Sequence, residues 1–323
     1  MTTLRKLWLP AAALLMCWPA WVASQERYPA KPIQVVIPFP PGGSLDIGIR
    51  ILQPVLSAKL GTPLVLLNRP GAGGAIGLDA VAKAPADGYT LAATSTSTFT
   101  VTPITAASLP YRMTDFTPVG NYAVDASVLV VHAEAPWKTY EDLIQYARRN
   151  PGKLSYGSPG VGTLSSLNME SLKAAYDIDL LQVPFPGTPQ ARTALLGKHV
   201  DVGAMAFSGV ASDLRSGALR ALVTSAVTRL PSFPDVPTLK EKNAPQASLN
   251  LDLGLYVRAG TSEDIVQTLS RALQEAAGDP AVASALARTG MFVHFQDRGS
   301  VKAQLESEYR SAMELGRKLK LTN

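Results

Sequence analysis

Short apolar runs alternate along the chain with longer segments in which apolar residues recur every three or four positions. A β-branched run bounded by proline or glycine is typical of a buried strand, and the longer period is typical of an amphipathic helix. These patterns predict strands at 33–37, 64–67, 89–94, 127–132, 154–156, 180–183, 201–205, 221–225 and 251–257. They predict helices at 44–59, 78–84, 139–149, 164–176, 188–196, 263–277, 281–289 and 300–318. Residues 115–119 lead into a further strand, 95–98 form a predicted hydroxyl-rich loop, and 103–115 form a predicted irregular segment.

Four glycine-containing loops each follow a predicted strand and precede a predicted helix, at 38–43, 68–77, 157–162 and 184–187. This arrangement presents backbone N–H groups and the positive end of a helix dipole to an anion. Glycine also serves simply to allow a tight turn, and for any single loop that interpretation is equally good. Four such loops in one chain favour an anion site built from backbone amides.

The alternation of strands and helices predicts an α/β fold in which each sheet is mostly parallel. The segments 36–42 and 182–187 both place Pro-Phe-Pro just before a glycine, which suggests two lobes with equivalent turns. Ligands of open α/β sheets bind at the carboxyl ends of the strands. With the strands at 127–132 and 221–225 as candidate hinge strands, we expect one lobe from residues 25–125 and 226–323 and a second from 126–225.

The first 24 residues have the pattern of a secretory signal sequence. Arg5 and Lys6 precede an apolar core at 7–16, and small residues at 22–24 offer a cleavage site. Lipid attachment at Cys17 is the alternative, although the preceding methionine is not the small residue that a lipobox requires. Cys17 is the only cysteine, so the mature chain would have no disulfide. We therefore expect an exported protein, and no other segment is long and apolar enough to cross a bilayer.

Charge and motif content argue against several classes of function. Charged residues make up 17% of the chain, the net charge is +5, and no basic run is interleaved with aromatic residues, so nucleic-acid binding is not expected. The run at 71–77 lacks the spacing of a dinucleotide fingerprint, and no P-loop or G-x-S-x-G motif occurs. The three histidines, His132, His199 and His294, lack metal-site spacing. We therefore expect no enzyme activity, no cofactor and no metal.

Four side chains near the loops each have two interpretations. Asp46 would repel a bound carboxylate directly, so it either supports the first helical turn or holds a water that bridges to the ligand. Asp201 either lines a cleft or only braces the end of its strand. Phe39 and Phe185 either flank an organic ligand or pack at the edges of the lobes.

Several motifs resemble the Bug family, the TctC-type periplasmic solute-binding proteins of tripartite tricarboxylate transporters. The similarity covers nearly the whole mature chain in the expected order. Its motifs are Tyr28-Pro-x-Lys-Pro-Ile33, Pro38-Phe-Pro-Pro-Gly-Gly-x-x-Asp46, Asn68-Arg-Pro-Gly-Ala-Gly-Gly74, Ala84-Pro-x-Asp-Gly-Tyr-Thr-Leu91, Asp115-Phe-Thr-Pro-Val119, Asn150-Pro-Gly-Lys-Leu154, residues 219–224 and Pro234-Asp-Val-Pro-Thr238.

The resemblance implies a two-lobed periplasmic-binding-protein fold that closes on a small organic carboxylate and delivers it to membrane subunits of the transporter. It implies a periplasmic location, a monomer and no catalysis. A carboxylate group of the ligand would be held by backbone amides of the first two loops, with ordered waters. The candidate ligand-binding residues are Phe39, Gly43, Ser44, Asp46, Gly74, Ala75 and Ser95 in the first lobe and Ser158, Gly162, Thr163, Ser166, Phe185, Gly187, Thr188 and Asp201 in the second.

The chain departs from the family pattern at three places. A usual His-Leu pair is Ser166-Leu167 here, Pro184-Phe-Pro-Gly187 replaces a Pro-Tyr-Lys-Gly type of sequence, and a usual tryptophan is missing from 251–254. These changes leave the first carboxylate site intact and leave open the chemistry of the other end of the ligand. The same fold could also serve as a ligand sensor for a signalling partner, which remains the alternative to transport.

Overall fold

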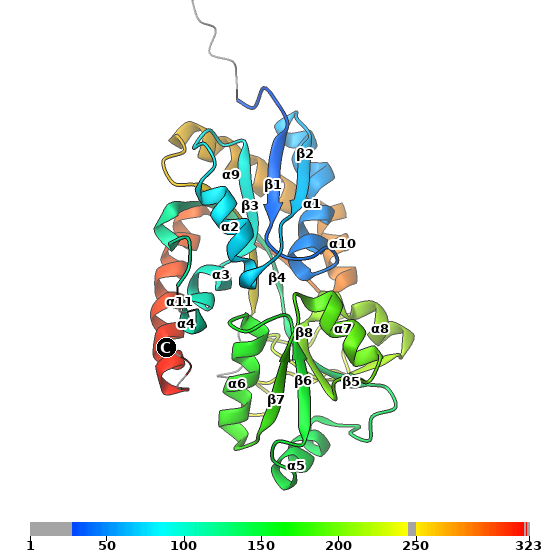
Figure 1. Ribbon diagram of the computed structural model, residues 1–323. Coiled ribbons are helices and arrows are strands. Elements are labelled where there is room, and N and C mark those ends of the chain that lie inside the picture. Colours follow the sequence, from blue (N-terminus) through cyan, green and yellow to red (C-terminus); the bar gives the residue numbers. More distant parts are fainter. Residues whose placement is uncertain (1–27, 107, 245–249, 320, 322–323) are drawn as a thin grey trace, which may run out of the picture.

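A computed structural model describes residues 28–106, 108–244, 250–319 and 321. The predicted signal sequence, including Cys17, lies outside the described residues. The chain forms two helix-flanked β-sheets, one above the other in Figure 1, so the prediction of a two-lobed α/β fold is confirmed. Within the described part of the chain, no helix combines the length and the apolar character needed to cross a membrane.

The first lobe is built on a six-stranded sheet with the strand order β11-β4-β10-β3-β1-β2. The interior strand β1, which lies between β3 and the edge strand β2, alternates its side chains between the two faces of this sheet. Ile33, Val35 and Ile37 enter the core on one face, and Val36 enters the core on the other. The strands are β1 (Ile33–Ile37), β2 (Leu64–Asn68), β3 (Thr90–Ser95), β4 (Phe116–Asp125), β10 (Leu251–Arg258) and β11 (Phe292–Gln296).

Helices cover both faces of this sheet (Figure 1). The helices α1 (Ser44–Leu60), α9 (Glu263–Ala277) and α10 (Pro280–Thr289) pack in one core cluster. The helices α2 (Ala75–Ala82) and α11 (Arg298–Lys318) pack in the other, together with Phe99. Helix α1 ends at Gly61, whose φ of 67° and bonds to Ala58 and Ser57 form the usual glycine stop.

The second lobe is built on a five-stranded sheet with the order β7-β6-β8-β5-β9. One core cluster holds α5 (Tyr140–Arg149) and α6 (Leu164–Tyr176), and another holds α7 (Thr188–Leu196) and α8 (Ala211–Ser216). The strands are β5 (Ser127–His132), β6 (Leu154–Ser158), β7 (Leu180–Pro184), β8 (Val202–Ala206) and β9 (Leu219–Thr224).

Both sheets are mixed rather than mostly parallel. In the first sheet β1 runs parallel to β2 and β3, whereas β10 is antiparallel to β3 and β4, and β4 is antiparallel to β11. In the second sheet β6 is parallel to β7 and β8, but β5 is antiparallel to β8 and β9. The strands that run against the others are β10 and β11 in the first sheet and β5 in the second. Of these, β5 and β10 are the first strands after each passage of the chain between the lobes. Such strands enter each sheet without a βαβ crossover, so they need not run parallel.

The chain first crosses between the lobes at Ala126, between the end of β4 and the start of β5. After β9 it does not return at once, because Leu230 and Leu239 pack in core clusters of the second lobe. Thr238 also forms a β-bridge with Thr224 of β9. We therefore propose that the second lobe extends through residue 244, beyond the expected boundary at 225.

Four short elements were absent from the predicted pattern. These are α3 (Ser97–Thr100), α4 (Thr102–Thr105), α8 and the edge strand β11. The residues expected to form a hydroxyl-rich loop and an irregular segment therefore contain two short helices. Each of these helices spans about one turn, which is too short to produce a recognisable helical period. Three single-turn 3₁₀ segments, η1 (Ala72–Gly74), η2 (Met113–Asp115) and η3 (Phe207–Gly209), complete the described elements.

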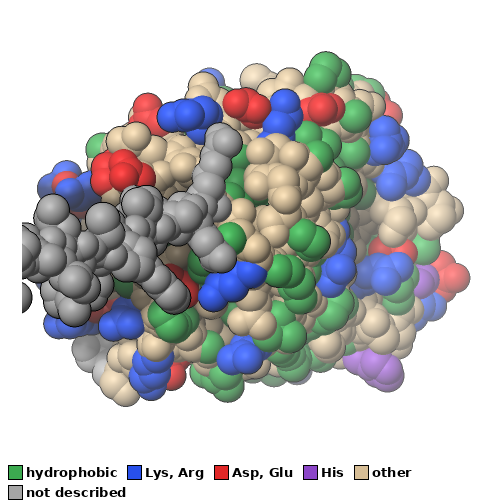
Figure 2. Space-filling model, turned by 90° about the horizontal axis from the view of Figure 1, so that it is seen from above, with side chains coloured by type: hydrophobic (Ala, Val, Ile, Leu, Met, Phe, Trp, Pro, Cys, Tyr) green, Lys and Arg blue, Asp and Glu red, His purple; other side chains and the backbone are tan. Residues whose placement is uncertain are grey.

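The outer surface of the first lobe mixes both signs of charge. On the face seen from above in Figure 2, lysine and arginine side chains alternate with aspartate and glutamate. This face therefore offers no broad basic surface of the kind that nucleic-acid binding requires.

Candidate functional site

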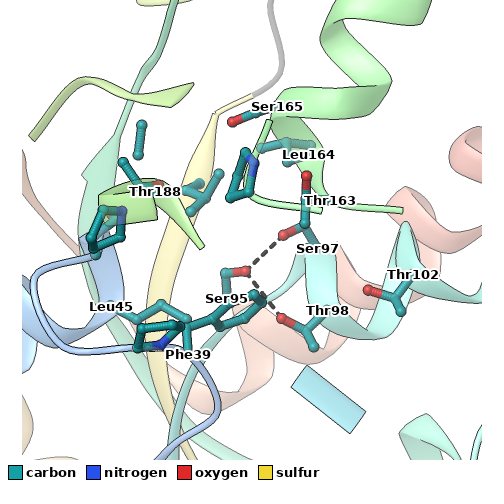
Figure 3. A pocket seen from close by; sticks show the side chains of 17 residues that line it. Phe39, Leu45, Ser95, Ser97, Thr98, Thr102, Thr163, Leu164, Ser165 and Thr188 are labelled. Atoms are coloured by element: carbon teal, nitrogen blue, oxygen red, sulfur yellow. Dashed lines mark hydrogen bonds between the residues drawn. The ribbon is translucent and has the colours of Figure 1, made fainter. Parts of the chain in front are cut away.

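A cavity lies between the two lobes, beyond the carboxyl ends of β1, β3, β6 and β8. Its water-accessible volume is about 60 Å³, room for roughly four or five water molecules. In Figure 3, Phe39, Leu45 and Ser95 lie on one side and Thr188 and Leu164 on the other. The lining residues are Phe39, Pro40, Gly43, Ser44, Leu45, Ser95, Ser97, Thr98, Thr102 and Leu251 from the first lobe and Pro159, Thr163, Leu164, Ser165, Thr188, Pro189 and Ala206 from the second.

Helix α1 begins at the wall of this cavity. Its N-cap residue, Gly43, is extended, and no side chain caps the helix. The first N–H groups of a helix have no partner within the helix. Because Gly43, Ser44 and Leu45 all line the cavity, this uncapped end directs N–H groups and the positive end of the helix dipole toward it.

Two helices of the second lobe also begin at the cavity. Helix α7 starts at Thr188 after Gly187, again without a side-chain cap. Helix α6 starts after Thr163, whose Oγ1 accepts a hydrogen bond of 3.4 Å from the Ser166 N–H. The amino ends of three helices, which have 17, 13 and 9 residues, therefore converge on one small volume. That convergence favours an anionic group there.

Hydroxyl groups form the part of the wall next to these helix ends. Ser95 Oγ lies 2.7 Å from Ser97 Oγ and 3.4 Å from Thr98 Oγ1, as the dashed lines in Figure 3 mark. Thr98 Oγ1 also lies 2.9 Å from the hydroxyl of Thr94. This network fixes the orientation of the hydroxyls and can donate hydrogen bonds to an oxygen-rich ligand.

The lobes are in contact around the cavity. Thr102 Oγ1 of the first lobe donates a hydrogen bond of 3.3 Å to the Gly162 carbonyl of the second. Gly187 approaches Pro40 so closely that a Cβ on this glycine would lie 2.9 Å from the proline Cδ. The structure therefore has the geometry of a closed two-lobed protein.

The cavity wall carries no formal charge, because none of the described lining residues is Asp, Glu, Lys, Arg or His. Across residues 28–319, outside the gaps, no group of three or more His, Cys, Asp or Glu is placed to hold a metal ion. An anion in this cavity would be bound by backbone and hydroxyl dipoles in a partly dehydrated site, where such dipoles act strongly.

Asp46 lies behind the wall and holds the first loop in place. Its Oδ2 accepts hydrogen bonds of 2.9 Å from the Gly42 N–H and from Arg50 Nε, and its Oδ1 accepts one of 3.0 Å from Asn68. Burial alone would raise the pKa of this carboxyl group, but the bonds from Arg50, Gly42 and Asn68 together lower its pKa. The two sequence-based interpretations of Asp46 were support of the first helical turn and a bridging water. The geometry favours a structural role, and the bonds to Gly42 and Asn68 extend that role to the two loops.

A second, acidic chamber adjoins the cavity. The two share Ser97 and Leu164 in their walls, and the water-accessible volume of the second is about 590 Å³. Asp252, Glu308 and His294 line the second chamber, and Gln304 Nε2 donates hydrogen bonds to both carboxyl groups. Burial raises the pKa of each carboxyl group. While these carboxyl groups are ionised, the chamber disfavours a second anionic group of the ligand.

Six of the fifteen sequence-predicted site residues line the cavity. They are Phe39, Gly43, Ser44, Ser95, Thr163 and Thr188. The other nine, Asp46, Gly74, Ala75, Ser158, Gly162, Ser166, Phe185, Gly187 and Asp201, do not.

Most of those nine residues stand just behind the wall. Ser158 and Ser166 both accept hydrogen bonds from Gln182 Nε2, at 2.9 and 2.8 Å. A Cβ on Gly74 would lie 3.3 Å from the ring of Phe39, so this glycine lets the ring lie against the second loop. Phe185 packs at the edge of a core cluster, as one of its two interpretations held.

Asp201 lies at the opposite edge of its sheet from the cavity. Its Oδ2 accepts hydrogen bonds of 2.8 and 2.9 Å from the N–H and the hydroxyl of Ser155, near the amino end of β6. Ligand contact is expected at the carboxyl ends of the strands, so Asp201 braces a strand end instead. Of its two sequence-based interpretations, the geometry favours bracing over ligand contact.

Sequence reasoning missed eleven lining residues. They are Pro40, Leu45, Ser97, Thr98, Thr102, Pro159, Leu164, Ser165, Pro189, Ala206 and Leu251. The dense run of hydroxyl residues at 94–98 was a usable signal for the polar wall. Leu251 and Ala206 reach the cavity only through strand order, which their local sequence does not reveal.

The sequence from residue 49 to residue 314 matches the family described as "tripartite tricarboxylate transporter family receptor", TctC. The chain belongs to this family. The expected resemblance is thereby confirmed, and the interlobe cavity can be considered within a family of receptors for transported solutes.

Three solved structures share this fold over nearly the whole chain. The periplasmic binding protein BugD is 28% identical with a TM-score of 0.87, over 91% of this chain and 99% of that one. MatC from Rhodopseudomonas palustris with bound malate is 28% identical with a TM-score of 0.84, over 90% and 100%. A protein of R. palustris with adipate is 26% identical with a TM-score of 0.88, over 91% and 99%.

Proposed function

We propose that this protein captures a small organic carboxylate between its two lobes in the periplasm. It then delivers the ligand to the membrane subunits of a tripartite tricarboxylate-type transporter, and it performs no catalysis. The observation that carries the proposal is the uncharged cavity at which the amino ends of α1, α6 and α7 converge. Such ends bind anions without a positively charged side chain.

The malate and adipate in the two solved relatives support a carboxylate as the ligand class. In this chain a carboxylate group fits the volume between the N–H groups after Gly43 and those after Gly187, with the hydroxyl groups of Ser95, Ser97 and Thr98 beside it. The small size of the closed cavity favours a short acid. The acidic character of the adjoining chamber disfavours a second carboxylate that points past Leu164.

Placing one negative charge at the cavity wall tests the proposal. Thr163→Asp keeps an N-cap residue that accepts the Ser166 N–H, since aspartate is a preferred cap. Its carboxylate would occupy the anion site, and like-charge repulsion should weaken binding by about a hundredfold or more. Thr139→Asp is the matched control, because Thr139 caps α5 in the same way in the second lobe and does not line the cavity.

Titration calorimetry with succinate, malate and adipate provides the measurement, using protein freed of co-purified ligand. Wild-type protein and the Thr139 variant are expected to bind at least one acid with similar affinity, and the Thr163 variant is expected to bind the same acid about a hundredfold more weakly or not at all. Unchanged affinity in a folded Thr163→Asp protein would place the ligand elsewhere. A wild-type protein that binds no acid of a broad mono- and dicarboxylate panel would end the carboxylate proposal.

A further inference from the structure

Asp125 is a fully buried carboxylate at the point where the chain passes between the lobes. It is the last residue of β4, and one residue separates it from β5. Its Oδ2 accepts hydrogen bonds from two hydroxyls, Ser44 Oγ at 2.6 Å and Ser208 Oγ at 2.5 Å. Its Oδ1 accepts a longer bond, 3.3 Å, from the Ser208 N–H.

The two serines belong to different lobes. Ser44 is the first residue of α1 in the first lobe and lines the ligand cavity. Ser208 lies in η3 of the second lobe, two residues after Ala206, which also lines the cavity. One oxygen atom therefore joins the ligand-facing loop of one lobe to the segment behind the cavity wall of the other. Whichever lobe Asp125 moves with, one of the two serine bonds spans both lobes.

The carboxylate has no charged partner among the described residues. Arg50 pairs with Asp46, Arg192 pairs with Asp213, and Asp125 takes part in no ion pair of the described structure. Burial raises the pKa of Asp125 to about 6, while the hydrogen bonds from Ser208 and Ser44 act to lower it. Burying a carboxylate without a cation costs free energy. The presence of such a carboxylate between the lobes therefore calls for an explanation beyond packing.

We propose that Asp125 is a positioning residue that holds the Ser44 end of α1 against the second lobe and thereby stabilises the closed, ligand-retaining form. This inference rests on the proposed function. Opening of the lobes would separate Ser44 from Ser208 and leave the buried carboxylate short of one donor. The two hydrogen bonds therefore stabilise the closed form. They act at the amino end of α1, which also faces the ligand.

Asp125→Asn tests this role with little change of shape. Loss of one hydrogen bond to a charged acceptor is expected to weaken ligand binding by about tenfold. The rise in the dissociation constant should come from faster ligand release rather than slower association. The variant still presents an intact cavity to the incoming ligand. Asp201→Asn is the matched control, since Asp201 also accepts two hydrogen bonds from a serine, Ser155, but on the edge away from the cavity.

A second pair of variants keeps the inference testable if Asp125→Asn does not fold. Ser208→Ala removes one arm of the junction, and Ser208 does not line the cavity. Ser155→Ala removes the equivalent bond to Asp201. The expected result is faster ligand release in Ser208→Ala than in Ser155→Ala, with similar melting temperatures.

The measurements are calorimetric affinities and chase-measured release rates for whichever of succinate, malate and adipate binds the wild-type protein. Release rates equal to wild type in both Asp125→Asn and Ser208→Ala would overturn the positioning role while leaving carboxylate capture intact. Absence of binding to the wild-type protein would instead count against the proposed function. An equal loss of affinity in the Asp201 and Ser155 controls would show a general structural effect and would also overturn the inference.

Discussion

Substitution of Gly187 by alanine should oppose closure without disturbing either lobe. The backbone of Gly187 has a φ of 179°, an extended conformation that any residue adopts, so alanine adds no backbone strain. Its Cβ would lie 2.9 Å from Pro40 Cδ and 3.0 Å from Pro40 Cγ. The proline belongs to the first lobe and its ring cannot rotate away, so the methyl group meets an obstacle only when the lobes are together.

The magnitude follows from the cost of overpacking. Contacts this short force a displacement of one lobe edge, and inserting one methyl group into a packed contact costs about 1–3 kcal/mol. If that cost falls on the closed form alone, the dissociation constant rises by about fivefold to 150-fold. The free protein should keep the stability of the wild type, because the open form has room for the methyl group.

The assay compares ligand affinity and thermal stability of Gly187→Ala, wild type and Gly278→Ala. Gly278 is the matched control, since its added Cβ would make only ordinary contacts of 3.4 Å or more at the end of α9. We expect weaker binding in the Gly187 variant only, with all three melting temperatures close in the absence of ligand. Wild-type affinity in Gly187→Ala would refute the reasoning that this contact tightens on closure.

Three further predictions follow from the charges around the cavity. Asp46→Asn should lower the free energy of unfolding by about 1–3 kcal/mol, because it weakens the bonds to Arg50 and the Gly42 N–H. The stability due to ionised Asp46 is present at neutral pH and is lost as the pH falls through its lowered pKa, which urea denaturation at several pH values can measure. For Asp125 the pH dependence of stability has the opposite sign, because its pKa rises from 3.8 to about 6 in the folded protein. The free energy of unfolding therefore falls as the pH rises through this interval, by up to about 3 kcal/mol at pH 7. Asp125→Asn should remove that loss, and equal pH profiles of the two proteins would contradict it. Ligand affinity should change less than about threefold between low and high salt, because no exposed charge binds the ligand, and a steep decline measured by calorimetry would indicate a basic binding residue.

The sequence predicts the regular elements of this protein well, because most of them are long enough to show a clear period. Strand β1, with its β-branched run, and helix α1, with a glycine before and after it, lie where the pattern placed them. The edge strand β11 was missed because Phe292 and His294 are exposed on it and no continuous apolar run marks it. The mixed direction of the sheets was missed as well, since local sequence does not encode which strands pair.

The site is predictable only in part, for a related reason. The glycine loops mark where strands end and helices begin, so they point to three residues that line the cavity, Gly43, Thr163 and Thr188. They do not indicate how far a side chain is from the cavity. Gly187 and Gly74 let neighbouring groups approach closely, but they do not line the cavity themselves. In the sequence, a glycine with this role cannot be distinguished from a glycine that lines the cavity.

Two aspartates near the cavity show what a motif can and cannot reveal. Asp46 stands in a recognisable motif and turns out to brace a loop, whereas Asp125 ends a strand without any motif and joins both lobes. The bond between Ser44 and Asp125 also limits how Ser44 can act on a ligand. Its hydroxyl hydrogen points to Asp125 while that carboxyl group is ionised, so it cannot be donated to a ligand carboxylate at the same time. Binding at the start of α1 must then come from backbone N–H groups, and replacing the Ser44 side chain would alter closure rather than the contact with the ligand.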